Sequence, residues 1–313
     1  MSHDLLDTLV NAQHTLMGWG GVPRDGFQQF AKELRGGGGE LLRHLSIPQD
    51  EYQAFVKLFL VAHVGRPIVQ IEQSVDLDRI SHCTVRSFAQ DSNLGITWEM
   101  FEQARNGVPE SFIGLSRLLS PFYKPLNEID IKDCPSKPGH IATRPILSQL
   151  GMILPGTVTF DNIQLHKYYN LNESITSINA AILAEQITTT QTAAVPDPVT
   201  LLISGKLTQT GERAVLGYHL PWFNSGDPDP CLLFQLSPLH DVFRGGNAVR
   251  PGWKIDSDEN LIFRESSNGM ALVLGKDCKR ATVSHHVSGK GMYDATAWRG
   301  DWQADVQVEE IEI

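Results

Sequence analysis

The last third of the chain most constrains its fold, because short apolar runs alternate there with turn residues. Between positions 199 and 313 the turns are rich in Gly, Pro and Asp. Apolar residues at every second position, bounded by such turns, are typical of half-buried antiparallel strands. The runs are VTLLISGKL, RAVLGYHL, CLLFQL, NLIFRE, MALVLG, ATVSHHV and VQVEEIEI. The sequence therefore predicts antiparallel β-structure throughout this region.

The final run predicts a closing strand that holds the β-structure together. Its apolar side chains are expected to face inward, while its glutamates compete for the outward places. The alternation slips at Glu309-Glu310, and one extra residue in the strand would restore it, so a β-bulge is a candidate there. The inward residues are Val306, Val308 and Ile311, and the glutamates are Glu309, Glu310 and Glu312.

Residues 1–130 instead show the three- and four-residue spacing of amphipathic helices. Four glycines at 36–39 separate the first two apolar stripes. Pro48 and the acids after it predict a helix start, and Thr97 is the expected N-cap of a helix that begins at Trp98. The apolar stripes are Phe27, Phe30 and Leu34; Leu41, Leu42 and Leu45; Tyr52, Phe55, Val56, Phe59, Leu60 and His63; and Phe112, Leu115, Leu118, Leu119 and Phe122.

Two stretches interrupt these patterns. Residues 124–145 hold four prolines and little periodicity, so we place a linker at 131–145, between a helical domain at 1–130 and a β domain at 146–313. Residues 188–198 are rich in Thr and end in Pro-Asp-Pro. That composition predicts an exposed, mobile loop.

Composition excludes several classes of partner. A net charge of −10 and a pI near 5.5 argue against a nucleic-acid-binding protein, which would show a basic face, and against unaided docking on anionic lipid. No apolar run approaches the about 20 residues of a membrane-spanning helix, the first residues lack the pattern of a signal peptide, and Ser2 excludes N-myristoylation. Cys83, Cys134, Cys231 and Cys278 form no C-x-x-C pair, which favours a reduced intracellular protein.

No motif supplies a complete ligand set for a metal or a cofactor. Gly36–Gly39 lacks the lysine and the preceding strand of a P-loop. Asp256–Asn260 begins like an EF-hand loop, but Leu261 and Ser267 replace the required Gly and Glu, so an acidic turn between strands is expected. In a strand, the pair His285-His286 would point its side chains to opposite faces. We therefore assign no catalytic, cofactor-binding or metal-binding residue.

Two other functional classes stay open. Ser, His and Asp are plentiful, so a hydrolase with a Ser/His/Asp site in a cleft between the domains is an alternative, although no nucleophile elbow is present. A carbohydrate-binding β-sandwich is another, and it requires exposed coplanar rings such as Trp253 or Trp298. The strand and turn tryptophans are Trp222, Trp253, Trp298 and Trp302.

From about Ile146 onward, the order of short motifs resembles the TLDc domain family. The motifs are ILSQL and LP (146–155), LHKYYN and ESITS (165–177), TLLIS (200–204), VLGY and PW (215–222), LFQLSP (233–238) and VQVEEIEI (306–313). The family's Arg-Asp-Gly-Phe is Asn172-Glu173-Ser174-Ile175 here, so the chain looks like a divergent member. Upstream, residues 95–112 resemble the helical segment of fungal TLDc proteins of the restriction-of-telomere-capping type.

The resemblance implies an α+β fold, with an all-helical N-terminal domain followed by a two-sheet antiparallel β-sandwich with flanking helices. We expect the helices to be EF-hand-like but metal-free, because the loop Gln103–Glu110 is too short and too poor in acids to bind calcium. The family has no established catalytic residues, and its members are linked to oxidative-stress resistance and to binding of the vacuolar proton-pumping ATPase.

The chain is therefore expected to be a non-catalytic, cofactor-free interaction or regulatory protein. Its expected partner is a protein, with V-type ATPase subunits implied by the resemblance, rather than a nucleic acid. A cytoplasmic location is expected, and peripheral association with the vacuole or other endomembranes is left open. The loop at 188–198 and the edge strands are the candidate contacts, since exposed loops and strand edges are common binding elements.

Overall fold

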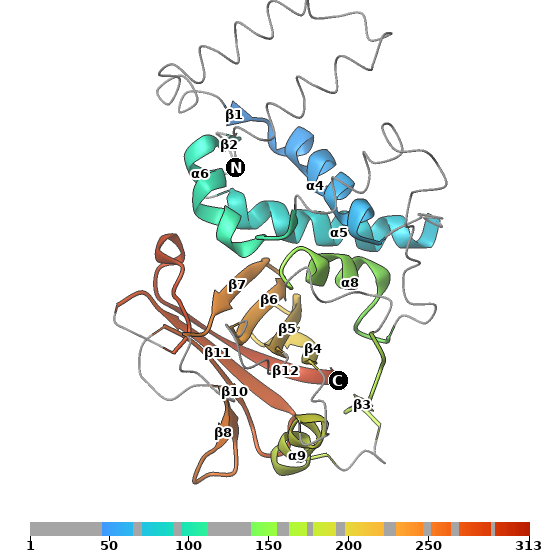
Figure 1. Ribbon diagram of the computed structural model, residues 1–313, viewed down its shortest axis with the longest axis vertical. Coiled ribbons are helices and arrows are strands. Elements are labelled where there is room, and N and C mark those ends of the chain that lie inside the picture. The colour runs from blue at the N-terminus through green and yellow to red at the C-terminus, as the bar shows by residue number, and fades with distance from the viewer. Residues whose placement is uncertain are drawn as a thin grey trace, which may run out of the picture.

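The computed structural model shows a layer of helices on one side of a large antiparallel sheet (Figure 1). It describes residues 46–64, 71–89, 95–111, 139–154, 163–173, 178–191, 198–221, 230–246, 252–263, 269–288 and 292–313. The stripes before Ser46, the four glycines, the helix expected after Ser111, Cys134 and Trp222 lie outside these residues. The expected EF-hand-like pairing depends on that second helix, so it stays a prediction, as do the domain boundaries.

The helices begin where the sequence provides caps and apolar stripes. Thr97 caps α6, because its hydroxyl accepts a hydrogen bond from the Met100 N–H at 3.3 Å, as expected. Phe55 departs from the predicted stripe of α4 and is 38% exposed. It precedes the buried Val56 by one residue, which rotates its side chain by about 100° around the helix axis. The elements are α4 (Gln49–Val64), α5 (Ile71–Phe88), α6 (Trp98–Ala104), η1 (Arg105–Gly107), α8 (Arg144–Gly151) and α9 (Ala180–Gln191), with the short strands β1 (Ser46–Ile47) and β2 (Ile96–Thr97) paired to each other.

The predicted antiparallel β-structure is confirmed, and its strands form one hydrogen-bonded sheet. The sheet has ten strands in the order β7-β6-β5-β4-β12-β11-β10-β9-β8, and β3 pairs with β12 beside this path. The expectation of two separate sheets is therefore replaced by a single continuous one. The strands are β3 (Tyr168–Asn170), β4 (Val199–Leu207), β5 (Arg213–Leu220), β6 (Leu232–Ser237), β7 (Asp241–Arg244), β8 (Lys254–Ile255), β9 (Leu261–Ile262), β10 (Gly269–Leu274), β11 (Arg280–His286) and β12 (Trp302–Glu312).

The sheet folds so that its two halves face each other. Four strands separate β7 from β11 along the sheet, which would put them about 24 Å apart if it were flat. Yet the ring centroids of Phe243 in β7 and His285 in β11 are 5.5 Å apart. Tyr218 in β5 and Phe263 after β9 are likewise 4.8 Å apart. The apolar side chains between these halves, together with α9, form what we call the inner core.

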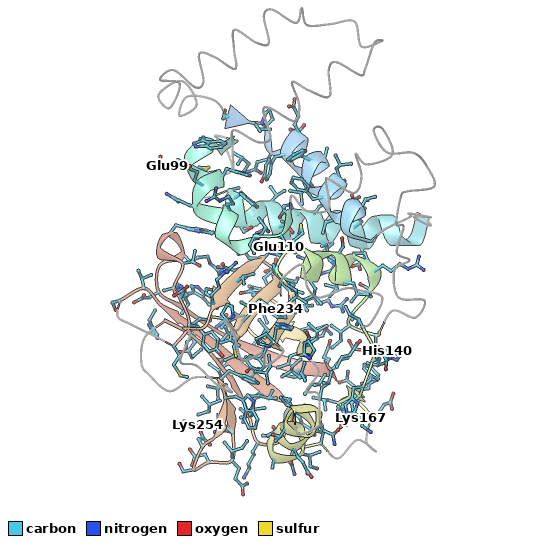
Figure 2. The ribbon with its side chains drawn as sticks, viewed as in Figure 1. Glu99, Glu110, His140, Lys167, Phe234 and Lys254 are labelled. Carbon is cyan, nitrogen blue, oxygen red and sulfur yellow. The ribbon has the colours of Figure 1, made fainter. Side chains whose placement is uncertain are left out.

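A second cluster, the outer core, lies between the helices and the other face of β4–β7. Alternate residues of the strands enter it, so that Leu233 faces the inner core while Phe234 faces the outer one. Phe234 (labelled in Figure 2) also covers Gly217, where an added Cβ would lie 2.2 Å from its ring. The remaining members come mainly from α4, α5 and α8. The helices and the sheet therefore share one apolar interface.

The closing strand β12 matches the prediction except at one glutamate. Its pairing with β4 shifts register between Val308 and Glu310, which confirms the bulge. Val306, Val308 and Ile311 all enter the inner core, as expected. Glu312, however, is only 4% exposed. The bulge restores the alternation at Ile311, so the next residue points to the face that the turn before α8 covers.

The Thr-rich stretch at 188–198 is partly a helix rather than a loop. Helix α9 continues to Gln191, because Ile187 extends the buried face formed by Leu183 and Ala184. The Thr188 hydroxyl donates a hydrogen bond to the Ala184 carbonyl at 2.8 Å, so this polar side chain has a partner within the helix. Residues 192–197 lie outside the described part of the chain.

Two further expectations concern membranes and thiols. Among the residues that the structure describes, no helix is long and apolar enough to cross a membrane. Cys83, Cys231 and Cys278 are buried and carry thiols rather than disulfides. The expected burial of the cysteines is therefore confirmed for these three residues.

Candidate functional site

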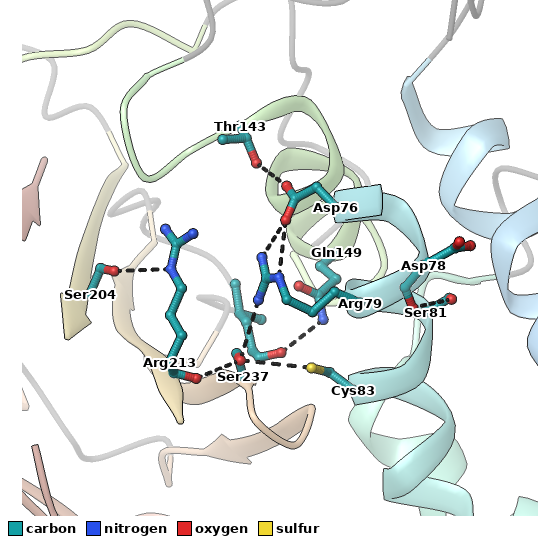
Figure 3. Close-up of polar contacts among 11 residues, drawn as sticks. Asp76, Asp78, Arg79, Ser81, Cys83, Thr143, Gln149, Ser204, Arg213 and Ser237 are labelled. Atoms are coloured by element: carbon teal, nitrogen blue, oxygen red, sulfur yellow. Dashed lines mark hydrogen bonds and ion pairs between the residues drawn. The ribbon is translucent and has the colours of Figure 1, made fainter. Parts of the chain in front are cut away.

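Charged and nucleophilic side chains lie close together where α5 and the start of α8 contact the end of β6 (Figure 3). We call this region the seam. Asp76 in α5 pairs with Arg79 one turn later and also accepts a hydrogen bond from the Thr143 hydroxyl at 3.2 Å. Arg79 in turn reaches the sheet, with its Nη1 3.5 Å from the Ser237 Oγ. The seam therefore fastens a helix to the sheet through a chain of polar contacts.

Ser237 and Cys83 in the seam are engaged in structural contacts. The Ser237 hydroxyl donates to the Arg213 carbonyl at 2.8 Å, and the Cys83 Sγ lies 3.7 Å from the same hydroxyl oxygen. Burial raises the pKa of the Cys83 thiol, and this outweighs the lowering by Ser237 and by the nearby arginines. A protonated thiol is a weak nucleophile. Neither side chain is activated for chemistry.

His240 lies where the helices and the sheet converge. Its Nε2 donates to the Gly107 carbonyl at 2.9 Å, which leaves Nδ1 to accept from the Gln149 side-chain amide at 3.1 Å. Burial lowers the pKa of His240 to about 4, while the bond to Gly107 acts in the opposite direction. Because both ring nitrogens are occupied by α8 and η1, His240 cannot serve Ser237 as a base. The seam therefore lacks the nucleophile–base pair of a Ser/His/Asp hydrolase.

A second buried network joins β7 to the segment before β12. Arg299 Nη1 lies 3.0 Å from the Asp241 Oδ2, and the Thr296 hydroxyl donates to Asp241 Oδ1 at 3.2 Å. Burial raises the pKa of Asp241, whereas the charge and hydrogen bond of Arg299 lower it. The Arg299 guanidinium also lies 4.6 Å from the ring centroid of Trp302, in cation–π contact. This network closes one end of the folded sheet.

The two adjacent histidines point to opposite faces of β11, as predicted. His285 is fully buried, and its Nδ1 donates to the Gly300 carbonyl at 2.7 Å while its Nε2 accepts the Thr296 N–H at 2.9 Å. His286 is half-exposed. Burial lowers the pKa of His285. Within the described ranges, no three His, Cys, Asp or Glu side chains come together as a metal site.

His219 in β5 is the third buried histidine. Its Nδ1 is 2.9 Å from the Thr200 hydroxyl on β4, and its Nε2 has no partner among the residues that the structure describes. Burial lowers the pKa of His219 to about 4. A Thr–His pair resembles a nucleophile and its base, but the third group that would orient the imidazole through Nε2 is not present in that part of the chain.

The three candidate tryptophans that the structure describes do not form an open stacking platform. Trp253 and Trp302 are partly buried and pack against the inner core, and the indole nitrogens of both are covered. Trp298 is also half-buried, with the Arg299 guanidinium 5.9 Å from its ring centroid. A carbohydrate-binding face needs exposed, coplanar rings, so the geometry does not favour that alternative.

A hollow of about 540 Å³ lies between the tips of two hairpins, one joining β8 to β9 and the other joining β10 to β11. The Asp256 carboxylate accepts bonds from the backbone of Asp258 and from the backbone and side chain of Asn260. These bonds, led by the Asn260 side chain, lower the pKa of Asp256. The predicted acidic turn between strands is thus confirmed, and its carboxylate is used within the turn.

The hairpin-tip hollow carries both signs of charge. The Asn260 side-chain oxygen accepts the Lys276 N–H at 3.2 Å and ties the two tips together. Two acids lie on the β8–β9 tip, and both bases lie with a third acid on the β10–β11 tip. Such a charged lining suits recognition of a polar protein surface better than binding of an apolar ligand. The lining residues are Ser257, Asp258, Glu259, Asn260, Gly275, Lys276, Asp277 and Arg280.

Sequence reasoning missed the residues that hold the seam and the buried network. Asp76 and Arg79 lie far along the chain from His240 and Asp241, which in turn lie far from Arg299, and no motif links the three positions. A signal was available in the strand sequences, because LLFQLS in β6 is apolar on both faces. A strand of this kind needs a cover on each side, and polar contacts are expected at the edges of such a cover.

Comparison with known proteins gives one similarity at low identity. No family model matches this chain. The chain is similar to "Restriction of telomere capping protein 5" of Leptosphaeria maculans, with 24% identity over 363 residues that cover 87% of this chain and 58% of the relative. It thus spans a little over half the length of that protein. This relative bears the name of the fungal protein type that residues 95–112 resemble.

Proposed function

We propose that this protein is a non-catalytic TLDc-type interaction protein that acts in the regulation of a V-type ATPase or in oxidative-stress resistance. The observation that carries the non-catalytic part is the use of its buried polar groups. His240, Asp241, His285 and Ser237 each hold two or more elements of the fold together. Groups that are committed in this way are not poised to react with a substrate.

The similarity to a restriction-of-telomere-capping protein supports the family assignment, as does the order of the motifs from Ile146 to the closing strand. That relative's name refers to telomere capping, and this process is a further setting in which the protein would act through a partner. A cytoplasmic protein with peripheral contact to endomembranes is part of the proposal.

We propose the hairpin-tip hollow as the contact surface. Its exposed side chains lie on two turns that hydrogen bonds tie together, which would reduce the conformational entropy lost on binding. Two bases, Lys276 and Arg280, lie beside Asp258, Glu259 and Asp277, and a partner with complementary charges would be steered toward it. The expected contact is a polar protein surface on an ATPase subunit.

Crosslinking followed by affinity purification tests the proposal. The parent chain should recover V-type ATPase subunits, and the double variant Lys276→Glu/Arg280→Glu should recover much less because the charge of the rim is reversed. Lys57→Glu/Arg105→Glu is the matched control, since it changes net charge equally on the helical side. Recovery of no ATPase subunit by the parent chain contradicts the partner, and equal recovery by both variants contradicts the surface.

A further inference from the structure

One buried carboxylate outside the seam and the hollow joins two segments that are distant in the chain. The Glu312 Oε2 accepts the Ile141 N–H at 2.6 Å and the Ala142 N–H at 3.3 Å. Hydrogen bonds from backbone donors to an ionised carboxylate are stronger than neutral ones. Glu312 therefore holds the turn 139–143 against the end of β12, although this turn lies in the stretch expected to be a linker.

Gly139 is required for this contact. An added Cβ would lie 1.6 Å from the Glu312 Oε1 and 2.5 Å from its Cδ, so no other residue fits without displacing the carboxylate. The turn is closed by its own backbone, because the Gly139 N–H donates to the Ala142 carbonyl at 3.2 Å. Ile141 is fully buried and belongs to the outer core. The turn thus has a fixed shape that matches the carboxylate.

Two side chains of the same turn reach other elements. His140 (labelled in Figure 2) stacks on Tyr168 of β3 with ring centroids 3.8 Å apart, and the Tyr168 hydroxyl donates to Glu310 at 2.6 Å. On the other side, Thr143 donates to Asp76 of α5. The turn therefore touches the closing strand, an edge strand and a helix at once.

Helix α8 begins directly after the turn and packs in the outer core, so the position of the turn sets the position of the helix. The Ser148 hydroxyl donates to the Leu60 carbonyl in α4, and the Gln149 amide donates to the Leu236 carbonyl in β6 at 3.1 Å. A shift of the turn would therefore move α8 relative to both the helices and the sheet. The inner core contains no residue of α4, α5 or α8, so it would stay closed.

We propose that Glu312 is the positioning residue of a clasp, formed with the turn Gly139–Thr143, that couples the end of the closing strand to the helical layer. When the end of β12 is displaced, the turn loses its acceptor and α8 loosens together with α4 and α5. The helical layer then opens while the two halves of the sheet remain packed. This coupling goes beyond the proposed function and does not depend on the identity of any partner.

Hydrogen–deuterium exchange of the full chain tests the clasp. The variant Glu312→Gln keeps the size of the side chain but removes its charge, so we expect about tenfold faster exchange in residues 139–151 and in α5. Peptides from β4, β5 and β11 should exchange at the parent rate. Glu310→Gln is the matched control on the same strand, because its amide oxygen still accepts from Tyr168, and it should change neither region.

Gly139→Ala provides a second route to the same state, since it keeps the glutamate but its Cβ displaces the carboxylate from the turn. It should give the same faster exchange in residues 139–151 and in α5 as Glu312→Gln. If Glu312→Gln does not fold, exchange in Gly139→Ala tests the clasp on its own. Unchanged exchange in residues 139–151 would overturn the proposal. An increase in exchange in β4, β5 and β11 as large as that in residues 139–151 would also overturn it, because Glu312 would then support the whole sheet rather than a clasp.

Discussion

Strands β4–β7 and strands β11–β12 belong to one sheet, yet they are buried in different ways. In β5, all residues from Ala214 to Leu220 are buried, because the inner core lies on one face and the helices on the other. In β11, buried and half-exposed residues alternate from Ala281 to His286. The sequences differ accordingly, with nearly continuous apolar runs in β4 and β5 and an apolar–polar alternation in β11.

Loss of the inner core and loss of the outer core are expected to affect the structure differently. The inner core is sealed by the sheet itself and by α9, so its loss would remove the contact between the halves. The outer core joins the sheet to helices from another part of the chain, and it is supplemented by the seam and by the Glu312 contact. Damage to the inner core is therefore expected to be global, whereas damage to the outer core is expected to act first on the helical layer.

The largest expected effect comes from placing a charge in the inner core. Ile311 is fully buried in β12, and Ile311→Asp would cost several kcal/mol against a total domain stability of about 5–15 kcal/mol. We expect loss of the cooperative thermal transition measured by circular dichroism. Gln307→Asp, at an exposed position of the same strand, should melt near the parent temperature. A cooperative transition at the parent temperature in Ile311→Asp would show that β12 is not essential to the inner core.

A pair of phenylalanine truncations tests whether the two cores respond differently. Phe243 faces the inner core and Phe234 the outer core, and both are buried. Each change to Ala should cost about 3–5 kcal/mol. In hydrogen exchange, Phe234→Ala should open α4, α5 and α8 before the sheet, while Phe243→Ala should affect β7 and β11. Identical exchange patterns in the two variants would mean that the cores unfold as one unit.

Acidification should destabilise the protein through its buried histidines, two of which line the helix-covered half. Burial lowers the pKa of His219 and of His240 from the ordinary value of 6.5 to about 4. Between pH 6.5 and about 4 the unfolded chain binds more protons than the folded one. The free energy of unfolding is therefore highest above the unfolded pKa and falls as the pH drops through this window. At pH 5 each histidine should cost about 2 kcal/mol.

Thermal melts at pH 7 and pH 5 measure this loss. His240→Gln removes one of the two titrations, so its melting temperature should depend less on pH than that of the parent chain. The matched control is His286→Gln, which makes the same substitution at a half-exposed histidine. An unaltered slope in His240→Gln would show that His240 is not held neutral by its burial.

The smallest expected effect is that of metals. The described residues bring no three metal-ligating side chains together, and the Asp256 carboxylate is already used by its own turn. Metal-coupled folding requires a complete ligand set. Added EDTA or Ca²⁺ should therefore leave the melting temperature unchanged, and a shift in either direction would reveal a ligand set that neither half of the sheet displays.

Local patterns predicted local structure well. Thr97 caps its helix, the acidic turn at Asp256 lies between strands, and His285 and His286 face opposite sides. The bulge after Val308 followed from a slip in alternation. Each of these depends on neighbours within a few residues, so the sequence holds the necessary information. The continuation of α9 beyond Thr188 was missed because the buried face that includes Ile187 outweighed the polarity of the threonines.

The contacts between distant segments could not be predicted in this way. Glu312 was expected at the surface, yet it lies against Ile141, and Arg79 reaches Ser237 across 158 positions of the chain. A polar side chain is stable in the interior only when a partner satisfies it, and a single sequence does not reveal which distant group will do so. The hairpin-tip hollow likewise required the spatial approach of two turns.

The sequence by itself determined the helical first part, the antiparallel strands and the irregular closing strand, because hydrophobic periodicity and turn chemistry act over a few residues. Only the tertiary structure decided that the strands form one folded sheet, that helices cover one of its halves, and that Glu312 holds the turn before α8. These features arise from burial and from hydrogen bonds between distant segments. The free energies of these contacts depend on which distant segments pack together, and local sequence does not specify that packing.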